Sequence, residues 1–359
     1  MVECFDHESG APMKESVFII AEAGVNHNGS LEVAKKMVAV AAACGCDAVK
    51  FQTFRAERIV SAGAPKCNYQ IENTGEEESQ LEMIRKLELN EAAHLELIRV
   101  AGELGIDFIS TPFDEESASL LVNLGVKRIK LPSGEITNLP FLVHVAKLKK
   151  PILLSTGMAY LSEIDEAVRA IRENSPLLHA QGSWPFLTLL HCLTQYPAPV
   201  QEVNLKCMLT LREAFKLPVG YSDHTLGIEV SLAAVALGAT VIEKHFTLDR
   251  TLPGPDHRAS LEPAELKEMV QGIRNIEASL GDGWKTPSAS EFENRERVRK
   301  GLVATKDFKV GHRLRPEDLM AKRPGNGISP GQRELVIGAI LQKDIERDSP
   351  ITWEHLLNR

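Results

Sequence analysis

The sequence predicts an α/β fold in which a (β/α)8 TIM barrel precedes a small β-rich C-terminal domain. Two observations support this prediction. Short apolar, β-branched runs alternate with longer helix-patterned stretches along most of the chain, which is typical of parallel βα units. Eight such runs occur, as a closed barrel of about 250 residues requires. An open doubly wound sheet is the alternative, but no GxGxxG motif follows the first run.

Each expected strand is a short apolar run, and each expected helix has apolar residues every three or four positions. The expected strands are residues 17–21, 48–51, 108–110, 128–131, 152–154, 188–190, 219–221 and 241–243. The expected helices are residues 30–44, 91–104, 115–124, 161–174, 227–237 and 263–280. Ser30 is a candidate N-cap for the first helix. Residues 55–78 show neither pattern, and a loop of that length is usually functional or disordered.

The pattern changes after residue 280, and this divides the chain into three expected regions. Residues 1–281 form the barrel, residues 282–297 form a glycine-containing, charged linker, and residues 298–359 form the small domain. Glycines and prolines interrupt the last region too often for another barrel unit. A module of about 60 residues is marginally stable alone, so we expect it to pack against the barrel or a second subunit.

Composition excludes several classes of protein. The 359 residues include 41 Lys plus Arg and 49 Asp plus Glu, a formal charge of −8, so we expect no nucleic-acid or anionic-membrane partner. No apolar run approaches the roughly 20 residues that cross a bilayer, and the first residues lack the pattern of a signal peptide. The six cysteines form no CxxC motif and read as reduced thiols, so we expect a cytoplasmic protein.

Polar residues gather just after the expected strands. The active sites of barrel enzymes lie at that face and draw residues from several strand ends, so we expect one chemical site there. The candidates are Glu22, Lys50, Gln52, Thr111, Lys130, Ser133, Glu135, Ser155, Thr194, Tyr196, His224, His245 and Asp256.

Two groups of these candidates suggest different chemistry. Lys50 and Lys130, together with nearby hydroxyls, offer the point charges and short donors that a phosphate and a carboxylate need, although each hydroxyl alone could simply cap a turn. His224 and His245 could hold a divalent metal with waters and a carboxylate such as Glu22. Hydrogen-bonded structural histidines are the alternative.

Two rival functions also fit these residues. A barrel aldolase could form a Schiff base through Lys50, Lys130 or Lys244. The second rival is implied by the family resemblance described next, and it is a non-catalytic, sugar-binding relative in polysaccharide biosynthesis that has lost turnover.

Several long motifs resemble those of the sialic acid synthases and, more broadly, of the nonulosonic acid synthases, which make N-acetylneuraminate or N,N'-diacetyllegionaminate. These motifs are IIAEAGVNHNG (19–29), VKFQTF (49–54), STPFD (110–114), KLPSGEITNLP (130–140), LSTGM (154–158), GYSDHT (220–225), EKHFTLD (243–249), GPDH (254–257) and KRPGNGISP (322–330). The resemblance implies a TIM barrel, a linker and an antifreeze-like (SAF-type) C-terminal domain. It also implies a domain-swapped homodimer in which that domain caps the barrel of the partner.

The resemblance further implies an activity and a role for each matching residue. The family condenses phosphoenolpyruvate with an N-acetylated mannosamine-type sugar, uses Mn²⁺ or Mg²⁺, and releases phosphate by C–O cleavage. By motif, phosphoenolpyruvate would be held by Lys50, Gln52, Thr111, Lys130, Ser133 and Ser155, the metal by His224 and His245, and the sugar by Glu22, Asn73, Tyr196 and Asp256. Arg323 would reach the N-acetyl group from the other subunit, and Glu135 is the candidate base that activates water.

The acceptor sugar is predicted from positions at which this sequence differs from one branch of the family. Thr194 stands where one sialic-acid branch has Asn, and CLTQYPAP (192–199) and GYSDHTLG (220–227) resemble the legionaminic acid synthases. The preferred acceptor is therefore 2,4-diacetamido-2,4,6-trideoxymannose, with N-acetylmannosamine second.

Overall fold

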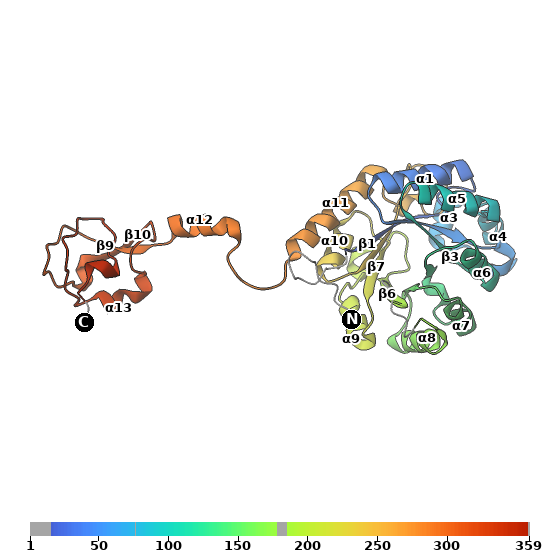
Figure 1. Cartoon of the computed structure of the whole chain (residues 1–359). Coiled ribbons are helices and arrows are strands. Elements are labelled where there is room, and N and C mark those ends of the chain that lie inside the picture. Colours follow the sequence, from blue (N-terminus) through green and yellow to red (C-terminus); the bar gives the residue numbers. More distant parts are fainter. Residues whose placement is uncertain (1–15, 76, 178–184, 358–359) are drawn as a thin grey trace. The chain divides into compact units, whose positions relative to one another are not determined.

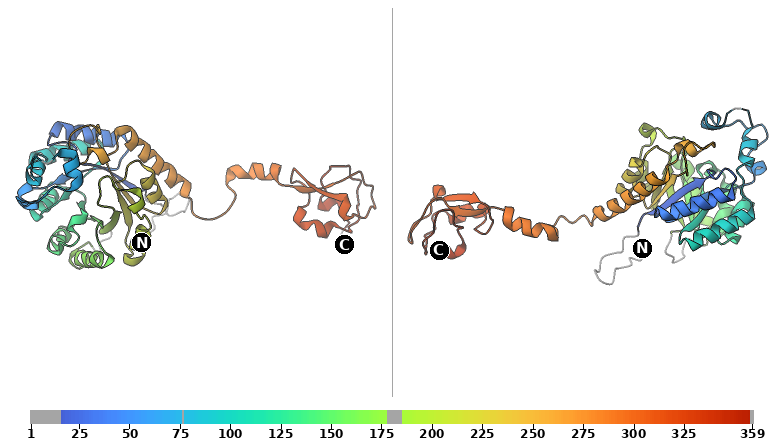
Figure 2. Two further views of the ribbon diagram at one scale, coloured as in Figure 1. Left: turned by 180° about the vertical axis from the view of Figure 1, so that it is seen from behind. Right: turned by 90° about the horizontal axis from the view of Figure 1, so that it is seen from above.

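The structure, a computed structural model of the chain, describes residues 16–75, 77–177 and 185–357. These residues form two compact units. The boundary between the units in the sequence lies between Gly281 and Asp282. Figure 2 shows the two bodies from two further directions. No helix within the described ranges is long and apolar enough to cross a membrane.

The first unit is an eight-stranded parallel barrel surrounded by helices (Figure 1). The strands are β1 (Phe18–Gly24), β2 (Ala48–Thr53), β3 (Asp107–Pro112), β4 (Ile129–Leu131), β5 (Ile152–Ser155), β6 (Leu187–Cys192), β7 (Val219–Asp223) and β8 (Val241–His245). Their hydrogen-bonded order is β3-β2-β1-β8-β7-β6-β5-β4, and β3 and β4 also lie side by side, so the sheet is nearly closed. The predicted barrel is confirmed.

The helices of the first unit follow the strands in alternation. They are α1 (Leu31–Ala43), α5 (Glu91–Glu103), α6 (Glu115–Asn123), α7 (Leu139–Lys147), α8 (Leu161–Asn174), α9 (Cys207–Phe215), α10 (Glu229–Ala236) and α11 (Pro263–Leu280). Helices α7 and α9 were not predicted. The buried residues of α7, Phe141, Leu142, Val145 and Ala146, follow a helical period, but over nine residues only. Helix α9 is as short, and its N-cap residue, Lys206, makes no side-chain capping hydrogen bond.

The expected loop 55–78 contains short helices instead of irregular chain alone. These are α2 (Ala56–Ile59) and α3 (Asn68–Thr74), and α4 (Gln80–Arg85) follows before α5. Ser79 begins α4 with a capping box, because its hydroxyl accepts from the backbone N–H of Glu82 while the Glu82 carboxylate accepts from the backbone N–H of Ser79. Helices of four to seven residues are too short for hydrophobic periodicity to reveal them.

The apolar core of the barrel unit has two layers. The larger layer lies between the strands and the helices and includes Ile19, Val49 and Ile242. The smaller layer fills the interior of the barrel with six residues, Ile20, Ala48, Ile109, Leu153, Leu190 and Val241. Because successive side chains of a strand point to opposite faces, one strand supplies both layers.

The second unit is small and contains a two-stranded antiparallel sheet. Strands β9 (Gly301–Ala304) and β10 (Leu319–Lys322) pair with Leu319 opposite Ala304. Helix α13 (Arg333–Val336) and several 3-10 turns complete the unit around a core that includes Leu302, Phe308 and Leu341. The predicted β-rich module is therefore confirmed.

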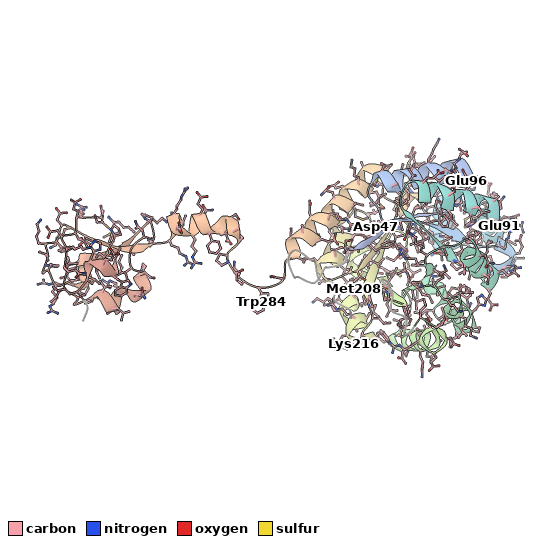
Figure 3. The ribbon with its side chains drawn as sticks, viewed as in Figure 1. Asp47, Glu91, Glu96, Met208, Lys216 and Trp284 are labelled. Carbon is pink, nitrogen blue, oxygen red and sulfur yellow. The ribbon has the colours of Figure 1, made fainter. Side chains whose placement is uncertain are left out.

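The segment expected as a linker is helical over part of its length. Helix α12 (Ala289–Val298) begins after Ser288 and has no buried residue. Trp284, labelled in Figure 3, precedes it and is 82% exposed. Cysteines in the described part of the chain, Cys44, Cys46, Cys67, Cys192 and Cys207, are free thiols, and Cys4 lies outside it.

His27 links folding of the barrel to pH. It is fully buried in the turn after β1, where Nδ1 accepts from the backbone N–H of Gly29, and burial, aided by His94, lowers the pKa of His27 from 6.5 to about 4. Between these pH values the unfolded chain binds the extra proton, so acidification destabilises the fold. We expect His27→Gln to reduce the loss of unfolding free energy between pH 7 and pH 5 by about 2 kcal/mol, measured by denaturant titration. An identical loss in both proteins would contradict this.

Candidate active site

The strands place polar side chains at the carboxyl end of the barrel interior. In six strands an apolar residue inside the barrel is followed, two positions later, by a residue that lines a cavity. The pairs are Ile20 and Glu22, Ala48 and Lys50, Ile109 and Thr111, Leu153 and Ser155, Leu190 and Cys192, and Val241 and Glu243. Strand alternation therefore builds an apolar layer with a polar layer above it.

The polar layer is the floor of a cavity of about 510 Å³. The structure brings together there most of the residues predicted for the site. Those that line the cavity are Glu22, Lys50, Gln52, Thr111, Lys130, Ser133, Ser155, Thr194, Tyr196, His224, His245 and Asp256. They come from all of the strands or from the loops that follow them.

A buried carboxylate, that of Glu243, lies between the two lysines. Its Oε1 is 3.4 Å from Nζ of Lys130 and its Oε2 is 3.7 Å from Nζ of Lys50, and Ser222 donates to Oε1 at 2.9 Å. Burial alone would raise the pKa of Glu243, but Lys130 and Lys50 bring it below the ordinary value. Glu243 is therefore ionised at neutral pH and holds both cations in place.

Lys50 and Glu22 form a second close pair in this cluster. Nζ of Lys50 is 2.8 Å from Oε2 of Glu22 and donates to Oγ1 of Thr111 at 3.1 Å. Burial raises the pKa of Glu22 to about 7 even though Lys50 opposes the shift. Burial also lowers the pKa of Lys130. The cluster thus combines cations with a carboxyl group that can exchange protons near neutral pH.

Hydroxyl groups face the cavity beside Lys130. Ser155 Oγ and Thr194 Oγ1 are buried and have no hydrogen-bond partner among the described residues. Ser133 Oγ accepts from the backbone N–H of Gly157 at 2.9 Å. A Cβ on Gly157 would lie 2.3 Å from Thr194 Oγ1 and 2.8 Å from Ser133 Oγ, so only glycine fits at this position. Two unpaired hydroxyls in a buried wall are suited to an oxygen-rich ligand.

Two neutral imidazoles lie at the ends of adjacent strands β7 and β8. Their ring centroids are 5.4 Å apart. Nδ1 of His224 donates to the carbonyl of Leu193 at 2.7 Å, which leaves a lone pair on Nε2, whereas Nδ1 of His245 is buried and has no hydrogen-bond partner in the described part of the chain. Burial lowers the pKa of His224 to about 4 and that of His245 well below its ordinary value, so both rings are free to act as ligands at pH 7.

The protein offers two nitrogen ligands for a metal ion here, one ring nitrogen each from His224 and His245. Within the described ranges no three His, Cys, Asp or Glu side chains are arranged to hold a metal ion. Asp256 comes closest, with Oδ2 at 4.0 Å from Nδ1 of His245, and burial raises its pKa to about 6. An ion bound here would take the two imidazoles and complete its coordination with water or ligand oxygens.

Aromatic rings cover the imidazole side of the cavity. The ring centroid of Tyr196 lies 4.1 Å from that of His224, 5.6 Å from that of His245 and 5.2 Å from that of Tyr69. Tyr69 comes from α3, within residues 55–78, for which the sequence predicted neither a helix nor a strand. These rings form an amphipathic wall of the kind that sugars pack against.

Three expected site residues do not line the cavity. Asn73 donates through Nδ2 to the carbonyl of Pro255 at 2.6 Å, so it supports the loop that contains Asp256. Glu135, the predicted base, does not line the cavity, and its carboxylate accepts a hydrogen bond from Nδ2 of Asn138 at 2.7 Å. Arg323 belongs to the second unit, where it is exposed.

Other cavity residues were given no role in the sequence prediction. Glu243 was among the polar residues expected at the strand ends, and its position two residues before His245 indicates that both face the same side of β8. Tyr69 and Gln70 lie on a short helix that no periodic pattern marks. Cys192 and Ser222 gave no signal beyond their strand positions.

Lys244 lies outside the cavity, which corrects its candidacy for a Schiff base. It alternates with Glu243 and His245, and its Nζ is 2.9 Å from Oδ2 of Asp223 and donates to the carbonyl of Thr225 at 2.6 Å. Both charged side chains of this ion pair are fully buried. The pair joins the ends of β7 and β8 behind the cavity wall.

Known proteins resemble this chain over nearly its whole length. The model of the NeuB family matches residues 37–285, and that of the SAF domain matches residues 299–357. The N,N'-diacetyllegionaminic acid synthase of Campylobacter jejuni is 55% identical over 339 residues, covering 94% of this chain and 99% of that protein. The synthase of the same name from Legionella pneumophila is 48% identical over 339 residues, covering 94% of each protein.

A solved structure gives the same result. The N-acetylneuraminic acid (sialic acid) synthetase of Leptospira borgpetersenii, in complex with citrate, is 36% identical with a TM-score of 0.68, and the match covers 78% of this chain and 90% of that one. The predicted resemblance to the sialic and legionaminic acid synthases is thereby confirmed. The chain belongs to the NeuB family and has a C-terminal SAF domain.

Proposed function

We propose that this chain is a nonulosonic acid synthase that condenses phosphoenolpyruvate with 2,4-diacetamido-2,4,6-trideoxymannose to give N,N'-diacetyllegionaminate and phosphate. N-acetylmannosamine, which would give N-acetylneuraminate, is the second acceptor. The main support is the single cavity that contains two buried lysines and two neutral imidazoles. The names of the relatives at 55% and 48% identity favour the diacetamido acceptor.

The lysine cluster suits the charged donor. Lys50 and Lys130 would neutralise the phosphate and carboxylate groups of phosphoenolpyruvate, and Thr111, Ser133 and Ser155 would bind their oxygens. The Ser155 hydroxyl is buried without a partner, so a ligand oxygen there would satisfy it. Because the cluster is buried, these interactions are stronger than they would be in water.

The imidazole side suits the sugar and a divalent ion, Mn²⁺ or Mg²⁺. His224 and His245 fit as ligands because both are neutral, both line the cavity, and each has a ring nitrogen without a hydrogen-bond partner among the described residues. When bound, such an ion polarises the aldehyde oxygen of the open-chain sugar as a Lewis acid. Tyr196 and Asp256 would contact the sugar and hold its aldehyde near the lysine cluster.

The cavity carboxylates suit the chemical steps. C3 of phosphoenolpyruvate bonds to the aldehyde carbon, whose oxygen takes a proton and becomes a hydroxyl. Positive charge develops at C2, and Glu22 and Glu243 stabilise it. Water adds at C2, and Glu22, whose pKa is about 7, accepts its proton in place of Glu135. The tetrahedral intermediate then expels phosphate by cleavage of the C–O bond.

The quaternary structure is a prediction from the resemblance, and the location is a prediction from the cysteine content and the first residues of the sequence. In a domain-swapped homodimer, Arg323 of one subunit would reach the N-acetyl group of the sugar bound to the other. The protein would act in the cytoplasm.

Phosphate release tests the proposal. Purified full-length protein with phosphoenolpyruvate and Mn²⁺ is expected to release phosphate only when an acceptor is present, and mass spectrometry is expected to find the nonulosonic acid. EDTA should abolish the reaction, and added Mn²⁺ or Mg²⁺ should restore it. Absence of phosphate release with either acceptor would overturn the proposal.

The same assay distinguishes the proposed synthase from a Schiff-base aldolase. Burial alone would lower the pKa of Lys50, but Glu22 and Glu243 raise it above its ordinary value, so Lys50 is a poor amine nucleophile. Lys130, whose pKa burial lowers, is the remaining candidate. EDTA-insensitive turnover together with borohydride trapping of a carbonyl substrate on the protein would support the aldolase.

A further inference from the structure

The wall of the cavity changes from polar to apolar within two or three residues on three adjacent strands. Each of β1, β2 and β3 contributes a polar residue to the floor and then an apolar residue, just beyond the strand end, to the wall. The pairs are Glu22 and Val25, Gln52 and Phe54, and Thr111 and Phe113. The cavity therefore has an apolar part above its polar floor on this side.

Helices α2 and α4 extend this apolar part. Ile59 of α2, Ile84 of α4 and the following Leu87 join the three strand-end residues in one cluster, which is separate from the two core layers of the barrel. Phe54 and Phe113 meet edge to face, with ring centroids 6.0 Å apart. All six residues also line the cavity, and we call them the apolar rim.

The apolar rim has no role in binding the phosphate, the carboxylate or a metal ion. None of its six side chains can donate or accept a hydrogen bond, whereas the polar roles in the proposed reaction belong to other cavity residues, among them the lysines, carboxylates and imidazoles. A ligand group that contacts the rim must therefore be apolar, because a hydroxyl placed there would lose its water without gaining a partner.

We propose that the apolar rim determines the choice of acceptor by receiving the methyl groups of a deoxygenated, acetamido-substituted sugar. This inference rests on the proposed function. The two acceptors differ in the required way, since 2,4-diacetamido-2,4,6-trideoxymannose has a methyl group at C6 and an acetamido group at C4, where N-acetylmannosamine has hydroxyls. Burial of a methyl group favours the first sugar, and desolvation of unpartnered hydroxyls disfavours the second.

The preference between the two acceptor sugars is limited in size because it arises from desolvation. An apolar pocket rejects an analogue that adds a hydroxyl by about 100-fold at most, because it relies on desolvation and on no specific repulsive contact. We expect the wild-type protein to prefer the trideoxy acceptor by about 10- to 100-fold in kcat/KM. One polar substitution in the rim should remove about tenfold of that preference.

The test is Ile84→Thr, with Ile71→Thr as its matched control. Both residues are half-buried isoleucines of short helices in the same segment, but Ile71 lines a separate cavity of about 270 Å³ beside Lys66. Kinetics with both sugars are expected to show a roughly tenfold smaller preference for the trideoxy acceptor in Ile84→Thr, with the KM for phosphoenolpyruvate unchanged. Ile71→Thr should keep the wild-type ratio.

The outcomes are distinguishable. Retained turnover of N-acetylmannosamine shows that the variant is folded, and Ile59→Thr replaces Ile84→Thr if that variant does not fold. An unchanged ratio in the rim variant, or an equal change in Ile71→Thr, would overturn the role of the rim alone. A wild-type preference for N-acetylmannosamine would overturn both the role of the rim and the proposed order of acceptors. If the wild-type protein releases no phosphate with either sugar, the proposed function itself fails.

Discussion

Replacement of His224 by alanine is expected to lower turnover by about three orders of magnitude while the fold is retained. In the proposed reaction His224 and His245 hold the divalent ion, and Nε2 of His224 is available because Nδ1 donates to Leu193. Loss of one of two protein ligands leaves an ion bound mainly by water. Phosphate release at saturating Mn²⁺ measures the effect, and electron paramagnetic resonance of Mn²⁺ measures binding without turnover.

His191 provides the control for this substitution. It lies on the neighbouring strand β6, where Nε2 donates to the carbonyl of Val203 at 2.7 Å, and it does not line the cavity. His191→Ala should therefore keep its Mn²⁺ affinity. Unchanged turnover and Mn²⁺ binding in His224→Ala would remove the metal assignment.

Replacement of Lys130 by methionine is expected to have the second large effect, a loss of catalytic efficiency with phosphoenolpyruvate. We expect kcat/KM for phosphoenolpyruvate to fall by about 100- to 1,000-fold, because a buried cation that contacts an anionic ligand contributes several kcal/mol. The loss also leaves Glu243 with Lys50 as its only cation at hydrogen-bonding or ion-pair distance among the described residues. Steady-state kinetics with phosphoenolpyruvate as the varied substrate measure the change.

A lysine three positions earlier is the matched control. Lys127 pairs with Asp107 at the surface and its side chain is 72% exposed. Exposed ion pairs contribute little, so Lys127→Met should leave the kinetics unchanged. If Lys130→Met keeps the wild-type KM for phosphoenolpyruvate, the lysine cluster is not the donor site.

The barrel could be predicted because strand alternation and helix periodicity are local signals. Buried parallel strands read as short apolar runs, and all eight were found within a few residues of their bounds. Helix α7 was missed because its apolar face recurs over only nine residues, and α3 because seven residues cannot establish a period. The sequence therefore could not place Tyr69 and Gln70, which belong to α3, at the cavity.

The candidate site was predictable where a residue follows directly from a strand. Lys50, Lys130, His224 and His245 lie in or immediately after strands, so the barrel fixes their direction. Glu135 lies on a 3-10 turn two residues past Ser133, where no strand geometry dictates orientation, and it does not line the cavity. The partners of Glu243 depend on three strands that are distant in sequence, which no local pattern records.

The buried ion pair of Asp223 and Lys244 has a consequence for ion binding. His224 and His245 each follow one member of this pair directly in the chain, so the cross-strand contact fixes the backbone from which both imidazoles extend. If a divalent ion binds there as proposed, its two nitrogen ligands would already be held in place, and little conformational entropy would be lost on binding. Substitution of Asp223 or Lys244 would then weaken the binding of the ion without removing either imidazole.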